Sequence, residues 1–164
     1  MSINYNGLSE EIGEMLGRHD LLLTTAESCT GGWVAQVLTA VPGASDWYDR
    51  GFVTYSNRSK QEMLGVNEMT LQQFGAVSEE TVHEMADGAL RHSHAQISLA
   101  ISGIAGPGGA TLDKPVGTVC FAWAAIGLTT RTATVYFNGN REQIRHQAVG
   151  HALTGVLDVL ADWR

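Results

Sequence analysis

The chain has 164 residues, of which 44% are hydrophobic and 16% charged, so it can bury a core and intrinsic disorder is excluded. The formal net charge of −7 argues against nucleic-acid binding through a broad basic surface, and no apolar run is long enough to span a membrane. Glycine is enriched, with 19 residues in no fixed period, which indicates tight turns or backbone that approaches a ligand closely.

Hydrophobic periodicity and turn residues predict helices that alternate with strands and a hairpin late in the chain. The first expected elements are a helix over 8–16, a strand over 21–26 and a helix from 33 that stops before 42. They are followed by a strand over 51–55, a helix that is capped by residue 56 or 57 and ends at 65, and a helix from 78. Three strands, over 97–101, 116–125 and 129–137, then precede a last helix capped by Asn140. This order favours an α/β fold, a three-layer α/β/α sandwich with a mixed, mostly parallel sheet. Residues 1–164 are expected to form a single domain.

Three segments are candidates for chemistry because each begins where a predicted buried strand ends. The first is TTAESCTGG, residues 24–32, in which a tight turn leads into a helix. The turn would direct the backbone N–H groups of Cys29, Thr30 and Gly31 into a crevice beside the Ser28 side chain. Such a turn can stabilise a phosphate or the oxyanion of an acyl-transfer step. An ordinary strand-to-helix turn, capped by Ser28 or Thr30, fits the same residues.

The second candidate segment is GFVTYSNRSK, residues 51–60. Tyr55 is expected at the carboxyl end of a strand and Lys60 in the first turns of the next helix, so both side chains can reach Ser28. A serine nucleophile needs a base, and a lysine can serve if burial or a neighbouring cation such as Arg58 lowers its pKa from about 10.4. A solvated lysine on an amphipathic helix is the alternative.

The third candidate segment is SGIAGPGG, residues 102–109. Backbone without side chains allows close approach by a ligand phosphate or ring, whereas a plain flexible loop is the competing interpretation. If the three strands are parallel neighbours, the three segments meet at one edge of the sheet. Arg141 and Arg145, at the start of the last helix, form a solvated face or bind a phosphate if that helix end abuts the site, in their own subunit or across an interface.

No metal site and no cofactor are predicted. His92 and His94 form an H-x-H at a polar helix end, which is a weak metal-binding signal. Cys29 and Cys120 do not form a C-x-x-C motif or a disulfide framework, so they are expected to be reduced thiols. Because the polar, acidic N-terminus is not a signal peptide, we expect a cytoplasmic protein.

The chain resembles the CinA C-terminal domain family in four segments, TTAESCTGGWVAQVLT, RGFVTYSNRSKQEMLGV, GAVSEETVHEMADGAL and ISGIAGPGG…KPVGTV. Their order and spacing match from about residue 8 to the C-terminus, and the joint pattern is far more specific than any one segment. The resemblance implies hydrolysis of the carboxamide of nicotinamide mononucleotide (NMN) to nicotinate mononucleotide and ammonia, in NAD recycling. It implies a small nucleotide as partner.

The resemblance maps a catalytic serine, lysine and tyrosine onto Ser28, Lys60 and Tyr55. The hypothesis is that Ser28 Oγ attacks the carboxamide carbon, neutral Lys60 takes the serine proton, and Tyr55 relays or orients it. The N–H groups after Ser28 would hold the oxyanion, and the glycine loop with an arginine would hold the nucleotide. The residues expected to bind the oxyanion or substrate are Cys29, Thr30, Gly31, Ser102, Gly103, Ala105, Gly106, Gly108 and Arg141.

One departure from the family concerns the glycine loop, where members often carry an aspartate after Gly-Pro, followed by two glycines. This chain has Gly108 at the acidic position and Ala110 in place of a glycine, so nucleotide affinity or substrate choice can differ. Two other functions stay open, a non-catalytic nucleotide-binding or regulatory module and a DNA-damage-linked role, although the net charge argues against direct DNA binding. An exposed edge strand favours a homo-oligomer, with no nucleic acid and no membrane as partner.

Overall fold

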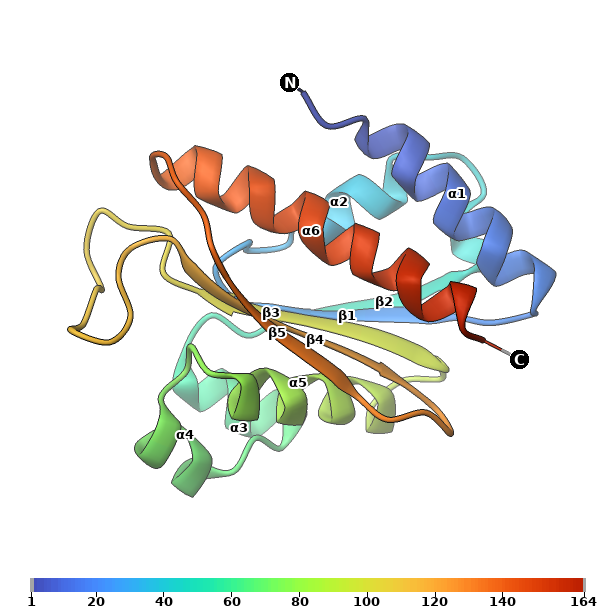
Figure 1. Cartoon of the computed structure of the whole chain (residues 1–164). Coiled ribbons are helices and arrows are strands. Elements are labelled where there is room, and N and C mark those ends of the chain that lie inside the picture. Colours follow the sequence, from blue (N-terminus) through green and yellow to red (C-terminus); the bar gives the residue numbers. More distant parts are fainter. Residues whose placement is uncertain (1, 164) are drawn as a thin grey trace.

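The computed structural model describes residues 2–163, in which helices cover both faces of one β-sheet (Figure 1). The helices are α1 (Tyr5–Arg18), α2 (Trp33–Thr39), α3 (Asn57–Leu64), α4 (Glu68–Phe74), α5 (Glu79–Arg91) and α6 (Arg141–Ala161), with a 3-10 turn η1 (Ala44–Asp46). The strands are β1 (Leu23–Glu27), β2 (Tyr48–Val53), β3 (Ile97–Gly103), β4 (Thr118–Ala125) and β5 (Arg131–Tyr136). None of these helices combines the length and apolar character that a bilayer crossing needs.

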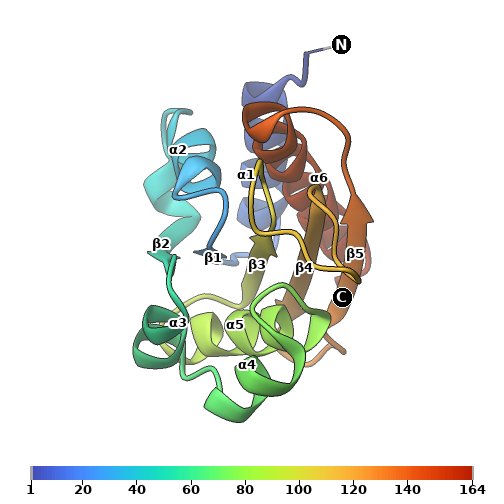
Figure 2. The ribbon, with the colours of Figure 1, turned by 90° about the vertical axis from the view of Figure 1, so that its left-hand side faces the viewer.

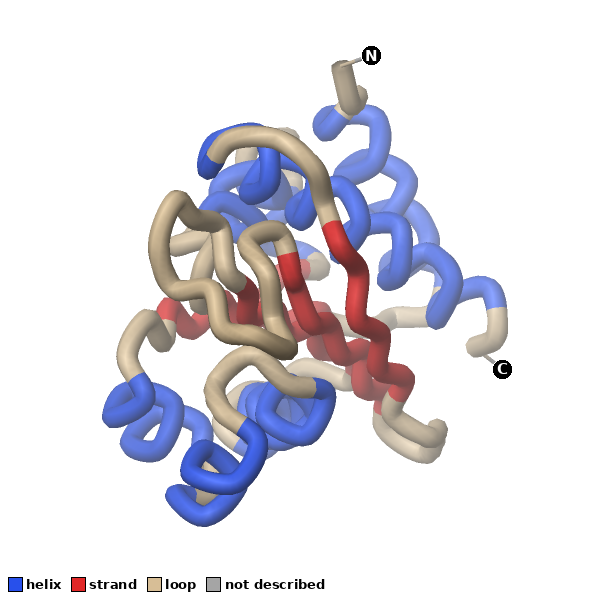
Figure 3. Tube along the Cα trace, turned by 60° about the vertical axis from the view of Figure 1, so that its left-hand side comes forward, coloured by secondary structure: helices blue, strands red, loops and turns tan. Residues whose placement is uncertain are grey.

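The sheet has the strand order β2-β1-β3-β4-β5. β1 pairs in parallel with both β2 and β3, whereas β3–β4 and β4–β5 are antiparallel. The expected mixed sheet is confirmed. Its strands mostly share one direction, because only β4 runs against the others, although the neighbour pairs divide evenly between parallel and antiparallel. Figure 3 shows the strands in red between two layers of blue helices.

The two faces of the sheet carry different cores because successive strand residues face opposite sides. Along β3, Ile97, Leu99 and Ile101 join a bulky core beneath α1, α2 and α6, whereas Ala100 joins a core of smaller side chains against α3, α4 and α5. Figure 2 shows these two helix layers on either side of the sheet. The three-layer α/β/α sandwich is therefore confirmed.

The contact between α3 and α5 is unusually close. A Cβ placed on Gly88 of α5 would lie 1.9 Å from the carbonyl oxygen of Leu64, at the end of α3. Only glycine permits this approach, so Gly88 fixes how near α3 lies to α5. This matters for the site because α3 carries Lys60.

Two sequence predictions need correction. The residue pattern predicts no element between the helix that ends at 65 and the helix from 78, yet α4 lies there. It is capped by Asn67, whose side chain accepts a hydrogen bond from the Met69 N–H, and it buries only Leu71, so its apolar periodicity is weak. The strand predicted over 51–55 instead ends at Val53, where its pairing with β1 ends, so Tyr55 lies beyond the strand.

Candidate active site

The carboxyl ends of β1, β2 and β3 lie side by side, as the three candidate segments require. Glu27, the last residue of β1, pairs with Val53 of β2 and Ile101 of β3. Hydrogen bonds extend this arrangement beyond the strand: the Ser28 N–H donates to the Ile101 carbonyl at 3.0 Å, and the Thr54 N–H donates to the Glu27 carbonyl at 2.8 Å. In an open α/β sheet this is the edge where ligands bind.

Lys60 reaches the Ser28 side chain from the other direction, out of α3. Its Nζ donates to Ser28 Oγ at 3.0 Å and to the Thr54 carbonyl at 2.8 Å. Lys60 is 1% exposed and Ser28 is 8% exposed, so the solvated-lysine alternative is excluded. The separation lies within the reach that a general base needs from its nucleophile.

Burial changes the acid–base properties of two side chains here. It lowers the pKa of Lys60 from 10.5 to about 8, because an ammonium loses its hydration there. Arg58 does not supply the neighbouring cation considered above, since its Nε pairs with Glu62 at 3.0 Å on an exposed face. Burial also raises the pKa of the Cys29 thiol to about 12, so Cys29 stays protonated and is a poor nucleophile.

A buried carboxylate, Glu27, fixes the turn that follows β1. It is 1% exposed and faces α2, whose N-cap, Gly32, has no capping side chain. The carboxylate accepts hydrogen bonds from Thr30 Oγ1 at 2.6 Å and from the N–H groups of Gly32 at 3.2 Å, Val34 at 2.9 Å and Ala35 at 3.1 Å. These donors stabilise a buried carboxylate that forms no salt bridge with a cation within residues 2–163. Sequence reasoning missed this role, although an acidic residue at the end of a buried strand is itself a signal.

Two backbone N–H groups of this buried turn, in which Cys29 is 7% and Thr30 0% exposed, have no hydrogen-bond acceptor among residues 2–163. The Gly31 N–H, expected to be a third donor, is used by the Ser28 carbonyl at 3.0 Å. The hydrogen bonds among residues 2–163 include none donated by the N–H of Cys29 or Thr30. Gly31 and Gly32 have φ of +59° and +100°, the left-handed conformation that this tight turn requires.

Arg145 of α6 binds the carbonyl side of the same turn. Its Nε donates to the Cys29 carbonyl at 3.0 Å and its Nη2 to the Thr30 carbonyl at 3.2 Å. The guanidinium carbon also lies 5.3 Å from the centre of the Trp33 ring, in a cation–π contact. Arg145 thus uses two of its guanidinium nitrogens to hold the turn, a role that the sequence did not predict.

Arg141, in the first turn of α6, joins the second and third segments. Its Nη1 donates to the Gly106 carbonyl at 2.9 Å and its Nη2 to the Tyr55 hydroxyl at 3.2 Å. Tyr55 is 63% exposed, and its hydroxyl has no hydrogen bond with Ser28 or Lys60. The structure therefore brings Ser28 and Lys60 together, and brings Tyr55 to Arg141 instead.

The glycine loop is anchored at its base and open at its tip. Ser102 and Ala105 are buried, and a Cβ on Gly103 would come within 2.7 Å of a β4 side chain, so this part packs closely. Gly106 presents its carbonyl to Arg141. Gly108 is exposed, and a Cβ placed on it would meet no atom within 4 Å, so the packing does not require a glycine at this position. Within residues 2–163, no three side chains of metal-ligating type gather as a group.

Known proteins resemble this chain over most of its length. The family model "CinA C-terminal domain" matches residues 5–160. The chain is 53% identical over 149 residues to the nicotinamide-nucleotide amidohydrolase PncC of Escherichia coli (strain K12), covering 89% of this chain and 88% of that protein. It is 47% identical to the protein of the same name from Pseudomonas putida, covering 93% and 94%. A crystal structure of the competence damage-inducible protein A (ComA) from Klebsiella pneumoniae superposes with a TM-score of 0.95 at 41% identity, covering 99% and 100%.

Proposed function

The chain belongs to the CinA C-terminal domain family, and we propose that it hydrolyses the carboxamide of NMN to nicotinate mononucleotide and ammonia. The similarity to nicotinamide-nucleotide amidohydrolases over most of both chains supports this substrate. The observation that carries the chemistry is the hydrogen bond of 3.0 Å between Lys60 Nζ and Ser28 Oγ at a buried strand end. It joins a nucleophile to a base whose pKa of about 8 suits proton transfer near neutral pH.

The first half of the proposed reaction forms an acyl-enzyme. Neutral Lys60 takes the Ser28 hydroxyl proton while Oγ attacks the carboxamide carbon, and the carbonyl oxygen becomes an oxyanion. The free N–H groups of Cys29 and Thr30 stabilise that oxyanion. The Lys60 ammonium, held by the Thr54 carbonyl, then protonates the carboxamide nitrogen, and the C–N bond breaks to release ammonia.

The second half returns the enzyme to its starting state. Lys60, neutral again, takes a proton from a water molecule that attacks the ester carbon. The bond to Ser28 Oγ breaks, Ser28 regains its proton from Lys60, and nicotinate mononucleotide leaves as a carboxylate. A product of this kind can re-enter NAD synthesis, which is the recycling role we propose.

Arg141 and the glycine loop are the proposed nucleotide-binding elements. Arg141 already spans Gly106 and Tyr55, so a substrate phosphate would exchange these neutral acceptors for a charged one. In this scheme Tyr55 orients Arg141 at the rim, and its hydroxyl is not required as a proton relay.

The test is ammonia release from NMN by the purified full chain, compared with Ser28→Ala and with the exposed-serine control Ser45→Ala. We expect turnover in the wild type and in Ser45→Ala and none in Ser28→Ala, with unfolding temperatures unchanged. Full activity in Ser28→Ala would remove Ser28 as the nucleophile. If calorimetry shows that the wild type binds NMN but assays show no turnover, the chain is a non-catalytic nucleotide-binding module instead. Assaying nicotinamide riboside alongside NMN reports the contribution of the phosphate.

A further inference from the structure

We propose that Arg145 is a positioning residue that orients the Thr30 N–H toward the reacting carbonyl oxygen. This inference rests on the proposed amidohydrolase function, in which that N–H is one of two oxyanion donors. Arg145 does not contact the Ser28–Lys60 pair in any hydrogen bond of the site. It acts through the backbone of the turn.

The guanidinium is held in a defined orientation. Two of its nitrogens bind two successive carbonyls, at 3.0 Å for Cys29 and 3.2 Å for Thr30, and its face lies over Trp33. The planar fork of an arginine matches two acceptors at once, which a lysine ammonium does not. A residue of the last helix thereby fixes a turn that lies far away in the sequence.

The orientation passes to the N–H through the geometry of the peptide bond. In a planar trans peptide the C=O and the following N–H point in opposite directions. Because the Cys29 carbonyl points to Arg145, the Thr30 N–H must point away from it. Arg145 belongs to the helix layer on one face of the sheet, and Lys60 reaches Ser28 from the layer on the other face. In the proposed arrangement, the Thr30 N–H, which points away from the guanidinium, faces the nucleophile.

Glu27 and Arg145 bind different polar groups of the turn. The Glu27 carboxylate takes the Thr30 hydroxyl and the N–H groups at the start of α2, while the Arg145 guanidinium takes the carbonyls. What remains without a partner is the pair of N–H donors on Cys29 and Thr30. A hydrogen bond to the carbonyl of a peptide also polarises its N–H, which strengthens the donor in a buried site.

The expected signature is a loss in kcat with little change in KM. Removing one oxyanion donor typically costs ~10²–10³ in rate, so Arg145→Ala should lower kcat by about 10² or more while KM changes less than about threefold. Arg145→Lys should fall between this variant and the wild type. Arg141→Ala should instead raise KM with a smaller change in kcat, because Arg141 is proposed to bind the substrate phosphate. Arg131→Ala, which removes an ion pair with Asp162 far from the turn, is the matched control.

The deciding experiment adds a probe of the oxyanion pocket, pyridine-3-boronic acid, whose boron forms a tetrahedral adduct with a serine oxygen. We expect Arg145→Ala to weaken boronate affinity by a factor comparable to its loss in kcat, and guanidinium chloride at low concentration to restore part of both. Unchanged kcat, or a lowered kcat with unchanged boronate affinity and no rescue, would overturn the inference. If Arg145→Ala does not fold, kcat and boronate affinity are measured on Arg145→Lys instead. If the wild type releases no ammonia from NMN, the proposed function fails, whereas boronate affinity still tests the role of Arg145.

Discussion

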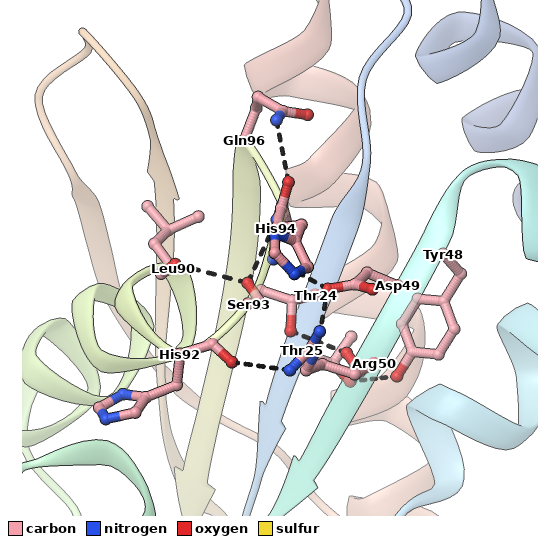
Figure 4. A network of polar contacts seen from close by, with 11 residues as sticks. Thr24, Thr25, Tyr48, Asp49, Arg50, Leu90, His92, Ser93, His94 and Gln96 are labelled. Atoms are coloured by element: carbon pink, nitrogen blue, oxygen red, sulfur yellow. Dashed lines mark hydrogen bonds and ion pairs between the residues drawn. The ribbon is translucent and has the colours of Figure 1, made fainter.

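Each end of β1 lies beside a polar network that contains a basic side chain, but the two networks differ in their charges and their burial. At the amino end, Asp49 accepts hydrogen bonds from Arg50 Nε at 2.9 Å and from the His94 N–H at 3.0 Å (Figure 4). Arg50 also donates to the His92 carbonyl at 3.1 Å. At the carboxyl end, the hydrogen-bond partners of the Lys60 ammonium within residues 2–163 are the Ser28 hydroxyl and the Thr54 carbonyl.

The difference between the ends lies in pairing and burial. Although its partial burial acts to raise the pKa of Asp49, hydrogen bonds from His94 and Arg50 outweigh it and lower that pKa, so the carboxylate stays ionised beside its cation. Lys60 is buried, no carboxylate within residues 2–163 forms an ion pair with it, and its pKa falls toward neutrality. A paired, half-exposed charge stabilises a surface, whereas an unpaired, buried one becomes available for proton transfer. The comparison predicts large effects at the carboxyl end and small ones at the amino end.

The largest effect is expected from Lys60→Arg. The guanidinium keeps the positive charge but cannot act as a base near neutral pH, so turnover of NMN should fall by about 10³ or more while NMN binding is largely kept. Arg50→Lys, the corresponding exchange at the amino end, should change turnover less than about twofold. Steady-state kinetics with calorimetric NMN binding check both variants. Retained turnover in Lys60→Arg would refute the assignment of Lys60 as base.

The pH dependence of kcat/KM tests whether the carboxyl end of β1, and not the amino end, controls the rate. Only the neutral amine of Lys60 can accept a proton, so activity should rise with pH and level off above the pKa of about 8. On the acid side, kcat/KM should fall about tenfold per pH unit. Asp49→Asn should show the same profile, because the amino-end network takes no part in the reaction. A profile that is flat from acid to alkaline pH would show that no group with this pKa controls the rate.

Gly88→Ala tests whether the packing of α3 supports the site. The new methyl group would lie 1.9 Å from the Leu64 carbonyl oxygen, so α3 must move away from α5. Overpacking of this kind costs about 1–3 kcal/mol in the free energy of unfolding, and the displaced Lys60 should lower kcat as well. Chemical denaturation with parallel kinetics measures the two effects. Gly17→Ala, at a glycine of α1 with no atom within 4 Å of an added Cβ and no positive φ, is the matched control for a helical glycine-to-alanine exchange without overpacking.

The smallest effect is expected from Asp49→Asn. This change removes the charge that pairs with Arg50, whose side chain is 43% exposed while that of Asp49 is 18% exposed, and such solvent-screened pairs contribute about 0–1 kcal/mol. Turnover should match the wild type, and the free energy of unfolding should drop by less than about 1 kcal/mol. A loss of activity in Asp49→Asn would show that the network at the amino end of β1 also affects the reaction.

The layout of the sheet could be predicted because strand ends are marked by local signals. Buried apolar runs followed by glycine or polar residues located the ends of β1 and β3, and the parallel pairing of β1 with both neighbours then brings the segments together. The contact of Lys60 with Ser28 follows from that arrangement. The mixed α/β sandwich was predictable for the same reason, since helices and strands alternate at their characteristic periods.

The contacts that hold the turn could not be predicted, because they join side chains to backbone groups. Glu27 binds N–H groups whose direction depends on the left-handed residues after it, and Arg145 binds carbonyls from a helix at the other end of the chain. The position of Glu27 at the end of a buried strand indicates a polar role, but the residue pattern does not show which groups Glu27 and Arg145 bind. The sequence predicts Tyr55 beside Lys60, but β2 ends at Val53 and the tyrosine hydroxyl meets Arg141 instead.

The central claim is that Ser28, activated by Lys60, becomes acylated during hydrolysis of NMN. Mass spectrometry of the full-length wild type, quenched in acid during the first turnovers, tests it most directly. We predict that the peptide containing Ser28 carries the nicotinate mononucleotide acyl group, that the adduct disappears as substrate is exhausted, and that Ser28→Ala shows none. Ammonia release at the wild-type rate with no adduct on that peptide at any time, or an adduct on a different residue, would contradict the claim.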